Sequence, residues 1–136
     1  MRAEFTDDLL TGSKMIDDQH RELIDRINAL LDAIESEAGE EEAERTIQFL
    51  SEYVDYHFAE EEKLQEEIGY PGIKEHKAKH AEFQKTVADL KAKFESGETE
   101  NFSELVKEEV IDWLFYHIQT FDRSVGEYRF MRENLA

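Results

Sequence analysis

Cysteine is absent from the chain, and its absence removes several kinds of chemistry. None of the 136 residues can form a disulfide, bind zinc or an iron–sulfur cluster through a thiolate, or act as a thiol nucleophile. Helix-breaking residues are also scarce, with one proline, Pro71, and six glycines. In a chain rich in Glu, Lys, Ala and Leu, so few breaks predict long helices.

Positive charge is the next deficit. The chain has 16 Lys and Arg residues against 34 Asp and Glu, and its formal net charge is −18. A surface that binds phosphate must be basic, and basic segments also mediate binding to anionic membranes. We therefore expect neither a nucleic acid nor a membrane as a partner.

Long apolar runs are missing as well. None approaches the roughly 18 residues that cross a bilayer, and the first eight residues, MRAEFTDD, lack the apolar segment of a signal peptide. We therefore expect a cytoplasmic protein. Hydrophobic residues still make up 40% of the chain, which is enough for one core, so we expect a single domain over residues 1–136.

The few turn-forming residues divide the chain into four stretches with apolar residues at three- and four-residue spacing. The predicted helices lie near residues 18–37, 41–67, 72–95 and 101–121. An irregular N-terminal arm of residues 1–17 precedes them, and a short tail to residue 136 follows. Short connections between amphipathic helices favour an all-α, antiparallel up-down-up-down four-helix bundle.

Every histidine falls on one of these apolar seams. The five are His20, His57, His76, His80 and His117. Glu61 follows His57 by four residues, and His76 and His80 have the same spacing, so each pair shares a helix face. A carboxylate in a bundle core is costly unless it is paired or bound to metal.

These positions predict a metal site inside the bundle. The alternative is that the five histidines are unrelated core residues. In that case, it would be a coincidence that all five lie on the inward faces of the helices. Glu60 and Glu62, which flank Glu61, fit a solvated charge run.

Asp122 is a further candidate that spacing alone does not decide. It follows His117 by five residues, which on a regular helix turns about 140° past a full circle and faces it away. It can join the site only if the helix widens into a bulge or ends there. The alternative is a surface aspartate beside Arg123.

The candidate ligands favour some classes of metal ion over others, but ligand type alone does not fix the metal, because the usual affinity order favours copper or zinc over ferrous iron. Five imidazoles and two carboxylates exceed the about four ligands of zinc, and they are too rich in nitrogen for calcium or magnesium. They suit two octahedral first-row ions, with three histidines on one and two on the other. If both carboxylates and one oxide or hydroxide bridge the ions, about one of their roughly twelve coordination positions stays open for a small ligand. The Glu-x-x-His pairs of ferritin-like di-iron enzymes are absent.

Taken together, the motifs resemble the hemerythrin family, in particular its bacterial single-domain members. The resemblance extends from Gly12 to Phe130. The matching pieces are Ile16-Asp17-Asp18-Gln19-His20, His57-Phe58-x-x-Glu61-Glu62, Tyr70-Pro71, His76-x-x-x-His80 and His117-x-x-x-x-Asp122.

The resemblance implies a non-haem di-iron centre with an oxo or hydroxo bridge, which binds dioxygen reversibly and is not an enzyme. It implies that His76, His80 and His117 hold one iron. It further implies that His20 and His57 hold the other, which keeps the open position, and that Glu61 and Asp122 bridge the two.

The resemblance also implies an apolar pocket around the oxygen site. Its candidate residues are Leu23, Phe58, Trp113, Leu114 and Ile118, for which ordinary core packing is a compatible alternative. The expected role is oxygen storage, delivery or scavenging. The alternatives are an oxygen- or redox-sensing module and a di-iron enzyme acting on peroxide or nitric oxide.

Overall fold

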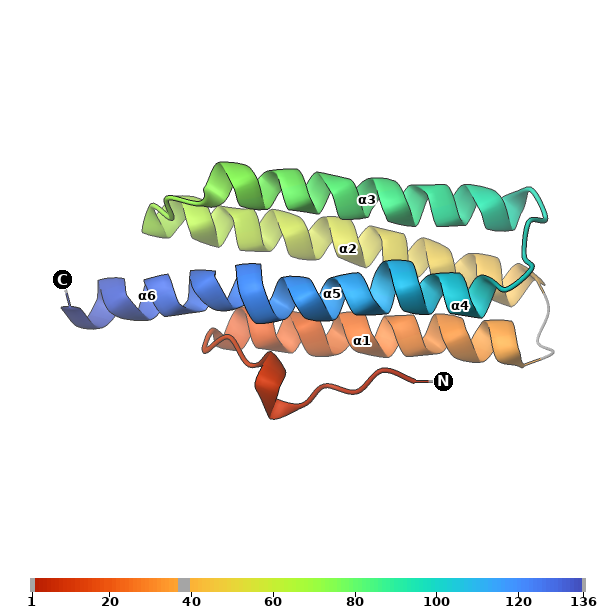
Figure 1. Ribbon diagram of the computed structural model, residues 1–136, viewed down its shortest axis with the longest axis horizontal. Helices are drawn as coiled ribbons and strands as arrows, with labels where there is room; N and C mark the ends of the chain where they lie inside the picture. The colour runs from red at the N-terminus through yellow and green to blue at the C-terminus, as the bar shows by residue number, and fades with distance from the viewer. Residues whose placement is uncertain (1, 37–39, 136) are drawn as a thin grey trace.

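The structure is an up-down-up-down bundle of four long helices, as predicted. The computed structural model describes residues 2–36 and 40–135, and the regular elements within them are all helical. The first three bundle helices are α1 (Lys14–Glu35), α2 (Glu40–Ile68) and α3 (Ile73–Glu95). Figure 1 shows them side by side with alternating direction, next to a fourth helix that runs back along α1.

The fourth bundle helix is continuous from Phe102 to Leu135, but two wide π turns interrupt its α-helical winding. Its parts are α4 (Phe102–Val106), η2 (Lys107–Ile111), α5 (Asp112–His117), η3 (Ile118–Asp122) and α6 (Arg123–Leu135). The turns η2 and η3 are π-helical. In Figure 1 the last part, α6, extends beyond the ends of the other helices.

Two predicted boundaries were wrong. The arm ends at residue 13 rather than 17, because the Ser13 side chain caps α1 by accepting a hydrogen bond from the Ile16 amide at 3.4 Å. The predicted tail after residue 121 is helical, because only Gly126 could interrupt it and that residue is buried in α6. The first helix ends at Glu35, and the predicted break at Ala38-Gly39 lies outside the described residues.

An apolar core fills the part of the bundle nearest the α1–α2 and α3–α4 connections. Its buried side chains include Leu23, Ile27 and Leu30 of α1, Ile47, Leu50 and Val54 of α2, Phe83, Val87 and Leu90 of α3, and Val106, Val110 and Leu114 of the fourth helix. They recur at the three- and four-residue spacing from which the helices were predicted. The core leaves the other half of the bundle interior for polar side chains.

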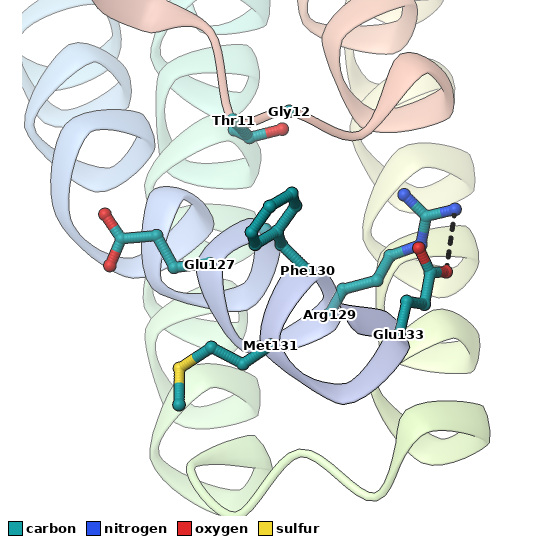
Figure 2. A pocket seen from close by; sticks show the side chains of 8 residues that line it. Thr11, Gly12, Glu127, Arg129, Phe130, Met131 and Glu133 are labelled. Carbon is teal, nitrogen blue, oxygen red and sulfur yellow. Dashed lines mark ion pairs between the residues drawn. The ribbon is translucent and has the colours of Figure 1, made fainter. Parts of the chain in front are cut away.

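The N-terminal arm packs along α1, where Ala3 exchanges two hydrogen bonds with Asn28, and its later residues contact η3 and α6. It contains one short 3-10 turn, η1 (Asp7–Leu9). Asp17 accepts hydrogen bonds from both the backbone amide and the hydroxyl of Thr11, each at 2.8 Å. A surface groove of about 430 Å³ lies between this part of the arm and α6. Figure 2 shows the side chain of Phe130, one of the residues that line the groove, directed toward Thr11 and Gly12.

In the part of the chain that the structure describes, no helix combines the length and apolar character needed to cross a membrane.

Candidate metal centre

All seven predicted ligand residues lie inside the bundle, and every long helix contributes at least one. His20 comes from α1, His57 and Glu61 from α2, His76 and His80 from α3, and His117 and Asp122 from the fourth helix. Their side chains are no more than 2% exposed. The seams identified from the sequence therefore do point these polar groups into the interior.

Asp122 reaches the cluster because of a π turn. The turn η3 covers Ile118–Asp122 and adds a residue to one winding of the helix. As a result Asp122 Oδ1 lies 3.1 Å from His117 Nε2, on the same side of the helix. Of the two possibilities that the spacing left open, the bulged helix is the observed one, and a surface position for Asp122 is excluded by its 1% exposure.

The two carboxylates lie between two sets of histidines, and each directs one oxygen to each set. Oε1 of Glu61 is 2.9 Å from His76 Nε2, and its Oε2 is 3.3 Å from His57 Nε2. Oδ1 of Asp122 is 3.0 Å from His76 Nε2, and its Oδ2 is 2.9 Å from His20 Nε2. This divided orientation is what a carboxylate that bridges two ions requires.

The ligand atoms form two groups that could each hold a metal ion. One contains Glu61, His76, His80, His117 and Asp122, and the other contains His20, His57, Glu61 and Asp122. Within each group, the ligand atoms all lie within 4.8 Å of one another. The groups share both carboxylates and divide the histidines three to two.

Unpartnered polar atoms test whether a metal fits this cluster. In the described residues, the Nε2 atoms of His20, His57 and His80 are buried without a hydrogen-bond partner, and so are Oε2 of Glu61 and Oδ2 of Asp122. Buried polar atoms normally have partners, and orphaned ones are costly. Some of these nitrogens and oxygens lie close together but do not form hydrogen bonds with good geometry. Such an arrangement is expected when the atoms are directed at a shared metal ion. The donor set therefore fits metal cations.

The electrostatics of the cluster keep its carboxylates ionised. Burial and the Asp122 charge oppose ionisation of Glu61, but contacts from His57, His76 and His80 outweigh them and lower its pKa to about 2. Burial likewise opposes ionisation of Asp122, yet the adjacent histidines, His117 first, lower its pKa well below its usual range.

The histidines respond in the complementary way. Burial disfavours the charged form of His76, but Asp122 and Glu61 outweigh this effect and raise its pKa to about 9. Burial lowers the pKa of His57, which favours the neutral form that ligates a metal. Two ionised carboxylates in a buried site create a demand for positive charge that metal cations satisfy.

The outer nitrogens of three histidines have partners that the sequence interpretation missed. His57 Nδ1 lies 2.8 Å from Gln19 Oε1, and His76 Nδ1 contacts the Gln65 amide at 3.0 Å. His80 Nδ1 lies 2.8 Å from Oε2 of Glu62. The assignment of Glu62 to a solvated charge run was therefore wrong. Periodicity gives the face on which a residue lies, but not the side chain that it meets on a neighbouring helix.

The predicted pocket residues belong to the packed apolar interior, and two of them stack on histidine rings. Leu23, Leu114 and Ile118 are completely buried. The Phe58 ring stacks on His80 with its centroid 3.8 Å away and the planes 2° apart. Trp113, which is partly buried, stacks on His117 with a centroid distance of 4.5 Å. Aromatic rings thus pack against two of the candidate ligand side chains.

Comparison with known proteins gives consistent results at three levels. The family model of the hemerythrin HHE cation binding domain matches residues 11–127. A bacteriohemerythrin of Pseudomonas paraeruginosa is 38% identical over 119 residues, which cover 85% of this chain and 74% of that protein. A bacteriohemerythrin of Methylococcus capsulatus is 34% identical over 116 residues, covering 85% and 87%. The crystal structure of a wild-type hemerythrin superposes with a TM-score of 0.79 at 30% identity, covering 92% of this chain and 95% of that one.

Proposed function

Because this chain belongs to the hemerythrin family, we propose that it holds two iron ions in the buried cluster and binds dioxygen there reversibly. The family match extends over residues 11–127 and supports a di-iron oxygen-binding or related function. Within that range we propose oxygen storage, delivery or scavenging rather than catalysis. We further propose that residues 1–136 act as one domain in the cytoplasm.

The observation that carries this proposal is the pair of overlapping ligand groups. The proposed ligands of one ion are His76, His80 and His117, and those of the other are His20 and His57. If both carboxylates and one solvent-derived oxygen were shared, the first ion would have six ligands and the second would have five. An octahedral ion with five ligands has one position left for a small molecule.

The protein residues would control access to that position. Bound iron would supply the electrons that dioxygen binding requires. The fully buried side chains of Leu23, Leu114 and Ile118 would exclude water, and the rings of Phe58 and Trp113 would fix the adjacent histidines. Excluding water slows the loss of a reduced oxygen species and so favours reversible binding over oxidation of the site.

A reconstitution experiment tests the proposal. Metal-free protein is loaded with ferrous iron without oxygen, desalted and analysed for iron, and its visible spectrum is then followed through cycles of oxygenation and deoxygenation. We expect two irons per chain and an absorption band that appears with oxygen and disappears on its removal. Zinc-loaded protein is the control and should show no band.

Other outcomes would contradict it. One iron per chain would exclude the shared site, and a band that never reverses would exclude oxygen carriage. Steady consumption of peroxide or nitric oxide in the presence of a reductant would favour the enzymatic alternative.

A further inference from the structure

Three of the candidate ligands have a hydrogen-bonding side chain at the nitrogen that faces away from the cluster, and these partners are not equivalent. Gln19 and Gln65 contact His57 and His76 through neutral amides. Glu62 contacts His80 Nδ1 at 2.8 Å through a carboxylate oxygen. The only charged partner of this kind in the described residues therefore belongs to the group with three histidines.

The direction of the Glu62 side chain follows from its place next to Glu61 on α2. One residue after Glu61, it points about 100° further round α2, away from the bundle axis and toward α3. The Glu62 side chain is 27% exposed, whereas His80 is 1% exposed. Phe58 covers the face of the His80 ring. Stacking on Phe58 thus fixes the plane of the His80 ring, and the hydrogen bond to Glu62 fixes which way the ring is turned within that plane.

This contact has two chemical consequences for His80. Because a carboxylate oxygen can only accept, the His80 Nδ1–H donates this hydrogen bond and Nε2 carries the lone pair. Nε2 is the atom that lies 3.7 Å from Oε1 of Glu61. A carboxylate at Nδ1 also makes the imidazole a more basic ligand than a neutral amide does. Both effects strengthen a bond from His80 to a cation in the cluster.

We propose that Glu62 is a positioning residue that selectively strengthens metal binding in the group of His76, His80 and His117. The proposal rests on the two-metal centre proposed above, but not on its binding of oxygen. Gln19, in the same type of position behind His57, serves the other group. Each half of the cluster thus has its own outer support.

Metal titration tests this selectivity. Metal-free protein is titrated with Co²⁺ without oxygen, and the absorption of the bound ion gives the affinity of each step. We assign the tighter binding step to the group of His76, His80 and His117, because it has one histidine more than the other group. We expect Glu62→Gln, which keeps an acceptor but loses the charge, to weaken this step about 10-fold, and Glu62→Ala to weaken it about 100-fold. The weaker step, at the group of His20 and His57, should change little. Gln19→Ala should produce the opposite pattern.

Glu60→Gln is the matched control, because it removes the same charge two residues away on the same helix. It should leave both steps unchanged. Equal weakening of both steps by Glu62→Gln, or no weakening, would overturn the proposal. If the wild-type protein binds a single ion, the two-metal centre fails. Even then, the proposed role of Glu62 requires Glu62→Gln to weaken the binding of that single ion. An unchanged affinity for the ion would overturn this role.

A spectroscopic measurement separates positioning from a general loss of structure. In zinc-loaded protein, the His80 Nδ1 proton should give a strongly deshielded NMR signal. This signal should move upfield in Glu62→Gln and disappear by solvent exchange in Glu62→Ala, while the corresponding His57 signal stays in place. An unchanged His80 signal in Glu62→Ala would show that the contact does not hold the proton.

Discussion

His117 and Asp122 lie five residues apart on one helix, yet His117 Nε2 and Asp122 Oδ1 are only 3.1 Å apart. A regular α-helix would place the two side chains on nearly opposite faces. The π turn η3 removes this difference by adding a residue to the winding between them. A local deviation from regular geometry therefore supplies the second carboxylate of the cluster.

Replacing that carboxylate tests its contribution. Asp122→Asn keeps the shape of the side chain but removes the negative charge that both ligand groups share. We expect metal affinity to fall by more than the roughly 100-fold typical of outer-partner mutations, and the metal content after desalting to fall below that of wild type. Asp18→Asn, at an exposed residue paired with Lys14, is the control. Equal metal content in the two variants would contradict a ligand role for Asp122.

Removal of metal should lower the stability of the whole bundle. Without cations, the cluster leaves buried polar atoms unpartnered. A ligand present at 100 times its dissociation constant adds about 2.7 kcal/mol to the free energy of unfolding. For a chain of this size, that corresponds to a rise of about 10 °C in Tm. Circular dichroism melts of metal-loaded and chelator-treated protein measure the difference, and equal melting temperatures would refute it.

Replacing a histidine tests whether the imidazoles of the cluster bind metal. His117→Ala removes a buried proposed ligand, whereas Glu60→Ala trims a residue one position before Glu61 that is not buried. We expect iron retention after dialysis to drop sharply in His117→Ala and to stay near wild type in Glu60→Ala. Elemental analysis of the dialysed samples checks this, and comparable losses in both variants would count against the assigned ligand.

The site could be predicted from the sequence only as far as helix periodicity reaches. His57 and Glu61 stand four residues apart, and that spacing alone placed them on one inward face. Asp122 could not be placed in this way, because a π turn leaves no mark in the spacing and a five-residue separation indicates the opposite face. Only the family resemblance assigned it to the cluster.

Contacts between helices were beyond the sequence for a different reason. Glu62 lies in an acidic run, and only the placement of α3 beside α2 shows that it meets His80. The presence of a glycine at position 126 of α6 could not be explained from the sequence either, because a glycine inside a helical pattern normally weakens the helix. The structure explains it, since α6 approaches the backbone of Thr11 too closely there for a larger side chain.

Leu114 is suited to test whether the apolar surroundings protect the site. The residue is fully buried and lies one turn before His117 on α5. Leu114→Ala should cost about 2–5 kcal/mol of stability, as such core truncations do. It should also admit water and speed the irreversible oxidation of iron-loaded protein several-fold, measured from the decay of the visible band.

Leu50→Ala provides the matched comparison for this effect. Leu50 is equally large, 1% exposed, and lies in the apolar half of the bundle on α2. It should lose similar stability without faster oxidation. If both variants oxidise at the same increased rate, the effect comes from general loosening and not from the surroundings of the site.

Gly126 and Thr11 form the junction between α6 and the N-terminal arm. A Cβ atom added at Gly126 would lie 1.9 Å from the backbone oxygen of Thr11, a separation that no packed structure tolerates. The arm has little freedom to yield, because Asp17 holds Thr11 by two hydrogen bonds. The groove in Figure 2 borders the same junction.

The Gly126→Ala variant therefore sets two opposing effects against each other. Alanine favours an α-helix over glycine by about 1 kcal/mol, but displacing a packed backbone segment costs about 1–3 kcal/mol. We expect net destabilisation in urea unfolding, with faster hydrogen exchange in the arm. Glu127→Ala, at the exposed neighbouring residue, should be neutral or slightly stabilising. A stabilised Gly126→Ala protein would mean that the arm is not held against α6, because the helix preference would then act unopposed.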